Sequence, residues 1–459
     1  MDIKKNCRIG IWGFGVVGKA AAQYFYNQGN QINVMDKRNP TIQETKILKA
    51  KNITWYTQKE EEIFFNSCDI IIPSPGVNIS QMCYATHKDK WVHELDFFYK
   101  TFHKPIIAIT GSIGKTSTTH ILGQIFKELS VPVSVGGNIG IPTFDLINQQ
   151  NNVDYAILEV SSFQLSYCKQ FSPKLAIWTN FHPNHLDHHT TEHEYFSAKE
   201  KIVAYQTEDQ LSLVHFALRH KMHFPNKGHR RSYFIKDRPT SEQLSSLKNN
   251  ESVYYLANNT VMVYSQGIHK PIILLTQALI DLTFIDNIIL LAAACDLMTL
   301  NVNALETVAH TTQLPEHRIE KIGTINNIDF YNDSKATTTA STLAAVEKLR
   351  NRPLHLFIGG LSKGVDRVPF IKQLHKQVNH IYCFGKEAAL LYDACITAQI
   401  PATQCATLDE AVVACTHLVQ SGDCVLLSPA GSSYDLYENY EQRGKHFKEL
   451  IMRFMQGKL

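Results

Sequence analysis

Two glycine-rich loops, one near Gly13 and one near Gly111, each follow an apolar strand-like run and precede a helix-like stretch. Glycine lets a backbone approach a diphosphate closely, and the N-terminus of the following helix attracts negative charge. Each loop therefore predicts a separate nucleotide-sized unit. Strand-like runs such as YAILEVSS, LAIWTNF and LHLFIGG alternate with helical stretches along almost the whole chain. This alternation predicts an α/β protein with mostly parallel sheets.

The length of the chain indicates several domains. Its 459 residues suggest two to four domains at roughly 150 residues each. We place one boundary at His103, before the run PIIAITG, and another at Pro315, which breaks a helical stretch. The expected domains are residues 1–103, 104–315 and 316–459. The polar stretch 206–270 has no clear pattern, and we expect one short strand, SVYYLANNTVMVYS, and little else there.

Charge and cysteine content exclude several classes of protein. Lys and Arg number 45 against 42 Asp and Glu, a net charge of +3, which is typical of neither a nucleic-acid-binding nor a membrane-surface protein. The ten cysteines include no C-x-x-C pair, so neither a zinc ribbon nor a thioredoxin-like site is indicated. The N-terminus fits neither a signal peptide nor a spanning helix. We expect a cytoplasmic protein with small-molecule partners, no nucleic acid and no membrane.

The N-terminal loop GFGVVG fits the pattern G-x-G-x-x-G, and Asp36 follows roughly 20 residues later, where a ribose-binding acid lies in dinucleotide-binding units. The same backbone chemistry suits any diphosphate. The loop alone is therefore compatible with a nicotinamide-dependent oxidoreductase, with another diphosphate ligand, or with a tight turn that binds nothing.

The central loop TGSIGKTSTTH keeps the chemical groups of a phosphate-binding loop. Lys115 suits the β- and γ-phosphates and the Thr116 hydroxyl suits Mg²⁺. The full pattern G-x-x-x-x-G-K-[ST] requires a glycine where this chain has Ile109. A shortened nucleotide loop and a plain glycine turn are the two interpretations.

Two further segments of the middle region carry possible metal ligands. Glu159 closes the strand-like run in LEVSSFQL, where a carboxylate could hold a divalent cation or lie on the surface. The segment NFHPNHLDHHTTEH has five histidines, but no H-E-x-x-H or cysteine partner accompanies them, so one Mg²⁺ ligand is favoured over a zinc site. Lys199 in FSAKEKI looks like a solvated lysine.

The last third of the chain places basic and hydroxyl side chains beside strand ends, where carboxylates and phosphates are recognised. Lys335 and Thr337 lie in NDSKATTT, and Lys363 lies in a glycine loop. Ser432 and Ser433 stand at an expected helix start. Helix N-capping is an equally good role for both serines and for Asp333.

Together, the motifs TGSIGKT, GGNIG, EVSSFQL, NHLDHH, AKEKI, LPEHRIE, NDSKAT, GGLSKG and LLSPAGSSYDLY resemble the Mur ligases, ATP-dependent amino-acid-adding enzymes of peptidoglycan assembly. The resemblance runs nearly end to end. GGNIG, SSFQL and DSKAT point to the branch that adds D-glutamate to UDP-N-acetylmuramoyl-L-alanine. The family's ATP loop is the shortened form T-G-x-x-G-K-[ST]. The resemblance implies a Rossmann-like UDP-binding domain, a central P-loop ATPase-type domain and a Rossmann-like domain for D-glutamate.

The resemblance also implies a reaction and a set of sites. ATP phosphorylates the substrate's terminal carboxylate, and the amine of D-glutamate displaces phosphate from the resulting acyl phosphate. The implied ATP site is Gly111, Ser112, Gly114, Lys115, Thr116, Asn287, Arg318 and Asp333. The implied UDP-substrate site is Gly15, Val16, Val17, Asp36, Arg38, Gly76 and Asn138. The implied D-glutamate site is Lys335, Thr337, Lys363, Ser433, Tyr434 and Tyr440. The implied catalytic residues are Lys115, Glu159, His185 and Lys199, with two Mg²⁺ ions held by Thr116, Glu159, His185 and a carbamylated Lys199.

The chain departs from the family pattern at two positions near these sites. Asn184 replaces the aspartate that commonly precedes His185, and Leu290 replaces the second asparagine of the adenine-site pattern H-N-x-x-N. The alternatives to this ligase are a folylpolyglutamate-type ligase, a nicotinamide-dependent oxidoreductase and a non-catalytic nucleotide-binding regulator. We expect a monomer.

Overall fold

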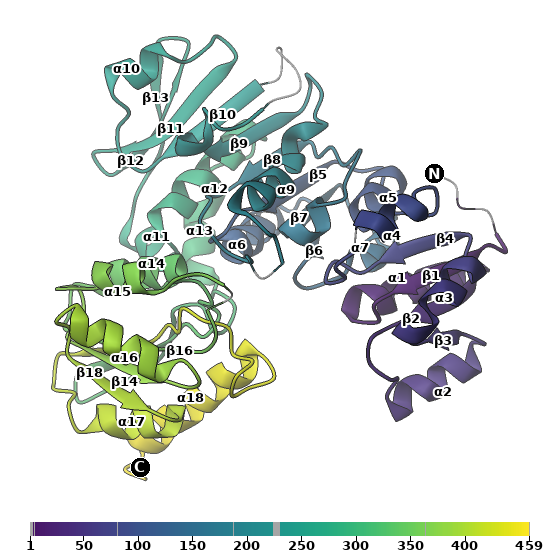
Figure 1. Ribbon diagram of the computed structural model, residues 1–459. Helices are drawn as coiled ribbons and strands as arrows, with labels where there is room; N and C mark the ends of the chain where they lie inside the picture. The colour runs from purple at the N-terminus through teal and green to yellow at the C-terminus, as the bar shows by residue number, and fades with distance from the viewer. Residues whose placement is uncertain are drawn as a thin grey trace. The chain divides into compact units, whose positions relative to one another are not determined.

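The computed structural model describes residues 3, 5–79, 81–186, 188–223, 230–362 and 364–458 (Figure 1). The chain divides into two compact units. The first is Met1–Phe181 with His193–Thr312, and the second is His182–Glu192 with Gln313–Leu459. The described strands form three sheets of four, nine and six strands. The predicted α/β class is confirmed, and the two predicted domain boundaries stay predictions.

The N-terminal sheet is wholly parallel, with strand order β3-β2-β1-β4. Its buried runs of Ile and Val are typical of strands that are covered on both faces. The strands are β1 (Arg8–Trp12), β2 (Gln31–Met35), β3 (Thr54–Tyr56) and β4 (Ile70–Pro73). The helices are α1 (Val16–Asn27), α2 (Ile42–Ala50), η1 (Gln58–Glu60), α3 (Glu61–Ser67), α4 (Gln81–Thr86) and α5 (Glu94–Thr101).

The central sheet has the order β13-β12-β11-β10-β9-β8-β5-β7-β6, parallel from β6 to β11 and antiparallel from β11 to β13. Its strands are β5 (Ile106–Thr110), β6 (Val133–Gly137), β7 (Tyr155–Glu159), β8 (Leu175–Trp178), β9 (Leu211–His215), β10 (Arg230–Ile235), β11 (Glu251–Ala257), β12 (Thr260–Ser265) and β13 (Ile268–Leu274). Its helices are α6 (Lys115–Glu128), α7 (Thr143–Ile147), η2 (Gln150–Asn152), α8 (Ser162–Leu165), α9 (Glu192–Ala204), η3 (Phe216–Leu218), α10 (Ser241–Ser245), α11 (Gln277–Leu282), α12 (Ile285–Leu297) and α13 (Ala304–Thr311).

The expectation of one strand between residues 206 and 270 is wrong. The run SVYYLANNTVMVYS is a hairpin of β11 and β12, and β9, β10 and β13 extend the sheet around it. The two turn residues, Asn258 and Asn259, have φ values of 48° and 56°. Two successive residues with positive φ are typical of the tight turn that suits the twist of a hairpin, and asparagine tolerates this conformation.

The C-terminal sheet has the order β14-β15-β19-β16-β17-β18 and is parallel except for the pair β14 and β15. The strands are β14 (Glu320–Ile325), β15 (Ile328–Asn332), β16 (Leu354–Gly359), β17 (His380–Phe384), β18 (Ala402–Cys405) and β19 (Cys424–Leu427). The helices are α14 (Thr339–Leu349), α15 (Val368–Gln373), α16 (Ala388–Thr397), α17 (Leu408–Thr416) and α18 (Tyr440–Met455).

The predicted helix start at Ser432 and Ser433 is wrong, and so is the alternative of N-capping by these residues or by Asp333. The next helix after β19 is α18, which is capped by the side chain of Asn439. Helix α14 is capped by the Thr338 hydroxyl. The two serines instead lie in a buried irregular loop.

In the first unit, the core is continuous from the N-terminal sheet to the central sheet. Four aromatic rings from α1, α5 and α7 pack together, with centroid distances between 5.2 and 5.9 Å for the pairs that join Tyr24 or Phe25 to Phe97 or Phe144. Each such pair contributes about 1 kcal/mol beyond the area it buries. Among the described residues, no helix has the length and apolar character needed to cross a membrane.

A buried histidine next to this core makes stability depend on pH. The His93 ring stacks on Tyr167 with a centroid distance of 5.3 Å, and burial, aided by Lys169 and Lys201, lowers its pKa to about 4. The unfolded chain therefore binds a proton more tightly, so stability falls as the pH drops from about 6.5 to about 4. We expect His93→Phe, which keeps the stacked ring, to lose less stability over this range than the wild type.

Urea unfolding at pH 7 and pH 5 tests this expectation. The denaturation midpoint of His93→Phe relative to that of the wild type should be higher at pH 5 than at pH 7. An unchanged difference would mean that His93 has the same pKa in the folded and unfolded states.

Candidate active site

The central loop joins β5 to α6 with a backbone that only glycine can adopt without strain. Gly111 and Gly114 have φ values of 147° and 84°. A Cβ atom at Gly111 would lie 1.9 Å from Thr179 Oγ1, and one at Gly114 would lie 2.5 Å from Asn287 Oδ1. Helix α6 begins directly after the loop, at Lys115. Its free N–H groups are thereby directed to the loop, as phosphate binding requires.

Two lysine ammonium groups meet at one carbonyl oxygen of this loop. Lys115 Nζ donates to Gly111 O at 2.8 Å and to Ser112 O at 3.2 Å. Lys199 Nζ, from α9, donates to the same Gly111 O at 2.9 Å. Lys199 is only 2% exposed. Its pKa is lowered well below the usual range, first by burial and then by the charge of Lys115, while Glu159 acts in the opposite direction.

The burial of Lys199 contradicts its interpretation as a solvated side chain. Its ammonium group lies 4.7 Å from the centre of the Tyr195 ring, and the Tyr195 hydroxyl is 3.3 Å from Ser112 Oγ. Composition and spacing gave no sign of this environment, and only the family resemblance identified the residue.

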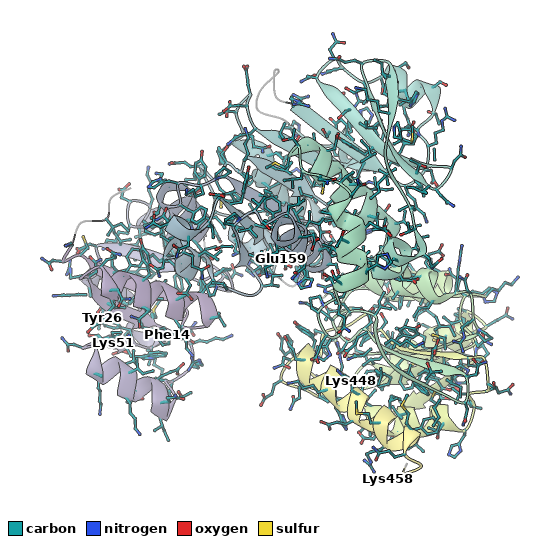
Figure 2. The ribbon with its side chains drawn as sticks, turned by 180° about the vertical axis from the view of Figure 1, so that it is seen from behind. Phe14, Tyr26, Lys51, Glu159, Lys448 and Lys458 are labelled. Carbon is teal, nitrogen blue, oxygen red and sulfur yellow. The ribbon has the colours of Figure 1, made fainter. Side chains whose placement is uncertain are left out.

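Glu159 ends β7 and connects the loop to a neighbouring segment. Its Oε2 accepts a hydrogen bond from Thr116 Oγ1 at 2.7 Å, and its Oε1 accepts one from Asn138 Nδ2 at 2.9 Å. Glu159 is 2% exposed and lies within the fold rather than on its surface (Figure 2). The alternative of a surface glutamate is therefore wrong.

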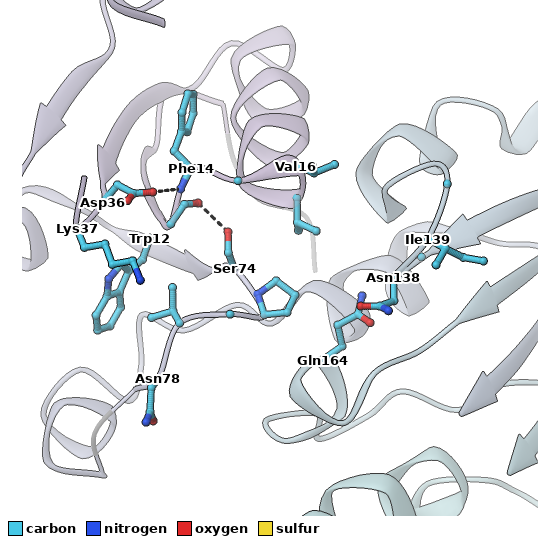
Figure 3. Close-up of a pocket in the computed structure, with 18 of the residues that line it drawn as sticks. Trp12, Phe14, Val16, Asp36, Lys37, Ser74, Asn78, Asn138, Ile139 and Gln164 are labelled. Atoms are coloured by element: carbon cyan, nitrogen blue, oxygen red, sulfur yellow. Dashed lines mark hydrogen bonds between the residues drawn. The ribbon is translucent and has the colours of Figure 1, made fainter. Parts of the chain in front are cut away.

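A cavity of about 730 Å³ lies next to Asn138 in the first unit (Figure 3). Its shape depends on two hydrogen bonds at the N-terminal glycine loop. Phe14 N donates to Asp36 Oδ2 at 2.6 Å, and Ser74 Oγ donates to Gly13 O at 2.7 Å. The lining residues are Trp12, Gly13, Phe14, Gly15, Val16, Val17, Asp36, Lys37, Gln58, Ser74, Pro75, Gly76, Val77, Asn78, Gly137, Asn138, Ile139, Gly140 and Gln164.

Nearly all the residues that the resemblance implies for the UDP-substrate site line this cavity. The exception is Arg38, whose guanidinium forms two hydrogen bonds to Glu44, at 2.7 and 2.8 Å. Lys37 lines the cavity in its place. Ser74, Asn78 and Gln164 also line the cavity, and none of the three was predicted from the sequence. Ser74 could have been found from its sequence position. It directly follows β4, and ligands of α/β proteins bind at the carboxyl ends of parallel strands.

Asn287, which the resemblance implies for adenine binding, packs against Gly114 of the phosphate loop. Its amide donates to Thr283 Oγ1 at 2.9 Å, and its oxygen closes the space next to Gly114. Leu290 is fully buried in the core, so the position where the family has its second asparagine contributes packing.

The remaining implied ATP residues, Arg318 and Asp333, belong to the second unit. Asp333 accepts hydrogen bonds from Ser428 Oγ at 2.8 Å and from Ile319 N at 3.2 Å. Burial raises its pKa to about 7. Burial thus favours the protonated form of this carboxyl group.

Of the described residues implied for D-glutamate, Lys335, Thr337, Ser433 and Tyr434 lie in loops of the second unit, and Tyr440 begins helix α18. Lys335 Nζ is 5.1 Å from the centre of the Tyr440 ring, Ser433 is buried and Tyr434 is 72% exposed. Thr337 lies in the loop before α14, and Lys363 lies outside the described residues. The buried Arg443 donates to the carbonyl oxygens of Ser334 and Gly431 and so joins two of these loops.

His185 lies in the segment His182–Glu192, which groups with the second unit. It has a φ of 57°, and its backbone N–H donates to Asn184 Oδ1 at 2.9 Å. Among the described residues, no group of three or more His, Cys, Asp and Glu side chains is arranged to hold a metal ion. The metal-binding role of His185 stays a prediction.

Three family models match successive parts of the chain. The description "Mur ligase MurD-like, N-terminal domain" matches residues 7–93, "Mur ligase middle domain" matches 109–272, and "Mur ligase, glutamate ligase domain" matches 317–431. The middle match includes the phosphate loop, Glu159 and Lys199.

Curated relatives are similar to the chain over almost its whole length. A UDP-N-acetylmuramoylalanine--D-glutamate ligase of Koribacter versatilis is 30% identical and covers 99% of this chain and 98% of that protein. An enzyme of the same name from Caldanaerobacter subterraneus is 29% identical and covers 98% and 99%. The solved MurF ligase of Thermotoga maritima in complex with ADP has a TM-score of 0.57 at 13% identity, with 99% and 96% covered, and shows the shared fold.

The packing at Gly114 gives a prediction for nucleotide binding. We expect Gly114→Ala to weaken the binding of an ATP analogue at least tenfold, because the added Cβ would displace Asn287 and the required positive φ is costly for alanine. UDP binding in the cavity should stay within about twofold of the wild type, since no cavity-lining residue changes. Calorimetric titration measures both, and unchanged nucleotide affinity would contradict a role for this loop.

Proposed function

The chain belongs to the Mur ligase family, and we propose that it is an ATP-dependent ligase that joins D-glutamate to UDP-N-acetylmuramoyl-L-alanine in peptidoglycan precursor synthesis. One observation carries the proposal. The hydrogen-bonded series Thr116, Glu159, Asn138 runs from the phosphate loop to the edge of the large cavity. A substrate in that cavity would thus have its reacting end near the nucleotide phosphates.

Family membership and the names of the full-length relatives argue against the nicotinamide-dependent oxidoreductase. The N-terminal match to a Mur ligase domain model also argues against a folylpolyglutamate-type ligase, since that class has no UDP-binding domain before its ATP loop. A non-catalytic regulator would release no phosphate in response to D-glutamate and the UDP-linked substrate, so phosphate release separates it from the ligase.

The proposed chemistry begins with two anions that repel each other. A carboxylate oxygen of the substrate attacks the γ-phosphorus of ATP, the bond to the bridging oxygen breaks, and ADP leaves. The products are an acyl phosphate and ADP. Lys115 reduces the repulsion because its ammonium lies beside the loop that would cradle the phosphates. The free amine of D-glutamate then attacks the acyl carbon, and phosphate leaves with loss of a proton from nitrogen.

The residues beside the loop fit magnesium. Thr116 offers a hydroxyl oxygen and Glu159 a carboxylate oxygen, 2.7 Å apart, and oxygen ligands are those that Mg²⁺ prefers. In this position the ion would supply charge neutralisation at the phosphate oxygens. Asn138 would keep Glu159 oriented through its hydrogen bond to Oε1.

We further propose that CO₂ converts Lys199 into a carbamate that takes part in this metal site. Carbamate formation needs an uncharged amine, and burial together with Lys115 favours that form. The uncharged amine adds to CO₂ and releases one proton to solvent, which leaves a carbamate anion that Lys115 would attract. The carbamate would also add an oxygen ligand for the second Mg²⁺, for which Glu159 and His185 are the other proposed ligands.

The second unit would contribute the amino acid and part of the nucleotide site. In this proposal Lys335, Thr337, Lys363, Ser433, Tyr434 and Tyr440 bind D-glutamate, and Arg318 and Asp333 bind ATP. Cationic and hydroxyl side chains suit a ligand with two carboxylates. The monomeric state and the cytoplasmic location stay predictions.

Phosphate release tests the proposed function directly. We expect ADP and phosphate to form only when ATP, Mg²⁺, UDP-N-acetylmuramoyl-L-alanine and D-glutamate are all present, with L-glutamate far less active. Omission of each component is the control. Turnover without the UDP substrate, or with NADH oxidation instead of ADP formation, would contradict the assignment.

The carbamate at Lys199 gives a separate prediction. Lys199→Ala should lose at least about 99% of the activity, because the loss of one preorganised electrostatic group typically costs 10²–10³ in rate. Added formate or acetate, which can occupy the vacated position with a carboxylate, should restore part of it.

The matched control is Lys100→Ala on helix α5, a lysine without a proposed role, which should keep full activity. Full activity of Lys199→Ala without any added carboxylate would show that the carbamate has no catalytic role.

A further inference from the structure

The cavity of the first unit contains an amide group, that of Gln164, whose orientation is fixed by its neighbours. Gln164 lies in the first turn of α8 and forms a capping box with Ser161. Gln164 Oε1 accepts hydrogen bonds from Ser161 N and Ser161 Oγ, both at 3.0 Å. Gln164 Nε2 donates to the two carboxylate oxygens of Glu94, at 3.3 and 3.2 Å. Both ends of the amide are therefore engaged.

Glu94 is a buried acid that the proposed reaction does not use. It is 4% exposed and begins helix α5. Its Oε1 also accepts a hydrogen bond from Thr143 Oγ1 at 2.6 Å. Among the ion pairs of the described residues, none includes Glu94. A buried carboxylate without a cation is costly, so it depends on the hydrogen bonds it accepts.

The chemistry of these contacts leaves one donor for the cavity. The backbone N–H of Ser161 can only donate, so the oxygen of the Gln164 amide must face Ser161 and its nitrogen must face Glu94. The two oxygens of one carboxylate lie too close together to take both N–H groups of that nitrogen in good geometry. The second N–H of Gln164 is left for another acceptor, and Gln164 lines the cavity on the same side as Asn138 (Figure 3).

We propose that Gln164 binds an acceptor oxygen of the UDP-linked substrate through this second N–H, and that Glu94 is the positioning residue that presents it. The inference rests on the proposed function, because it takes the cavity as the site of that substrate. Glu94 itself would repel an anionic ligand. With Gln164 between them, the carboxylate instead orients a donor toward the ligand's phosphate or carbonyl oxygens.

The test is a double-mutant cycle on the affinity for UDP-N-acetylmuramoyl-L-alanine, measured by calorimetry without ATP. Glu94→Ala and Gln164→Met should each weaken binding about tenfold, as expected for a lost hydrogen bond to a charged acceptor. In the double variant the affinity should be no lower than in Gln164→Met alone, since Glu94 acts only through Gln164. Additive losses would overturn the inference.

Glu94→Gln gives a second test, because it keeps a hydrogen-bond acceptor at this position and leaves no void where the side chain was. In Glu94→Gln, the new amide oxygen can accept from Gln164 while its nitrogen faces Thr143. Affinity should therefore stay within about twofold of the wild type. Affinity as low as in Glu94→Ala would contradict the orienting role.

The matched control is Asp96→Ala, on the same helix. Asp96 accepts hydrogen bonds from the backbone N–H groups of Lys169, Gln170 and Phe171 and does not line the cavity. Its loss should lower the unfolding temperature and leave substrate affinity unchanged. A wild type that fails to bind the substrate would overturn the proposed function together with this inference, whereas a wild type that binds with no change in the variants would overturn the inference alone.

Discussion

The arrangement of charges at one carbonyl oxygen underlies the account of this protein. Lys115 and Lys199 both donate to Gly111 O, at 2.8 and 2.9 Å. Two ammonium groups at one acceptor repel each other, and the buried one loses more of its hydration. Burial and the charge of Lys115 therefore both lower the pKa of Lys199. The glycine backbone makes this possible, because Thr179 and Asn287 fill the space that a side chain would need.

Glu159 extends this charge pattern toward the substrate cavity. It is held by Thr116 on one side and by Asn138 on the other. A buried carboxylate with two hydrogen-bond donors keeps one geometry, which is what a metal ligand or a substrate-positioning group requires. Glu94 and Gln164 repeat the same arrangement at another position along the cavity. In both places, a buried acid orients an amide group that lines the cavity.

The sequence predicted much of the fold because buried parallel strands are continuous apolar runs. The strands β5, β7 and β16 are of this kind. The hairpin of β11 and β12 was missed as two strands, since its Asn-Asn turn is a weaker hairpin signal than Asn-Gly. Local spacing identified the central glycine loop and Glu159 as candidates, and left a plain turn and a surface glutamate as the alternatives. Burial of Lys199 and the pairing of Arg38 with Glu44 depend on tertiary contacts, which no local pattern contains.

Isotope-edited carbon NMR tests the central claim most directly. The protein is equilibrated with ¹³C-labelled bicarbonate near neutral pH, and the carbamate region of the spectrum is recorded. The account predicts a carbamate signal in the wild type that disappears in Lys199→Ala. A wild type without such a signal, or a signal that persists in the variant, would contradict the claim that Lys199 is an uncharged amine that reacts with CO₂.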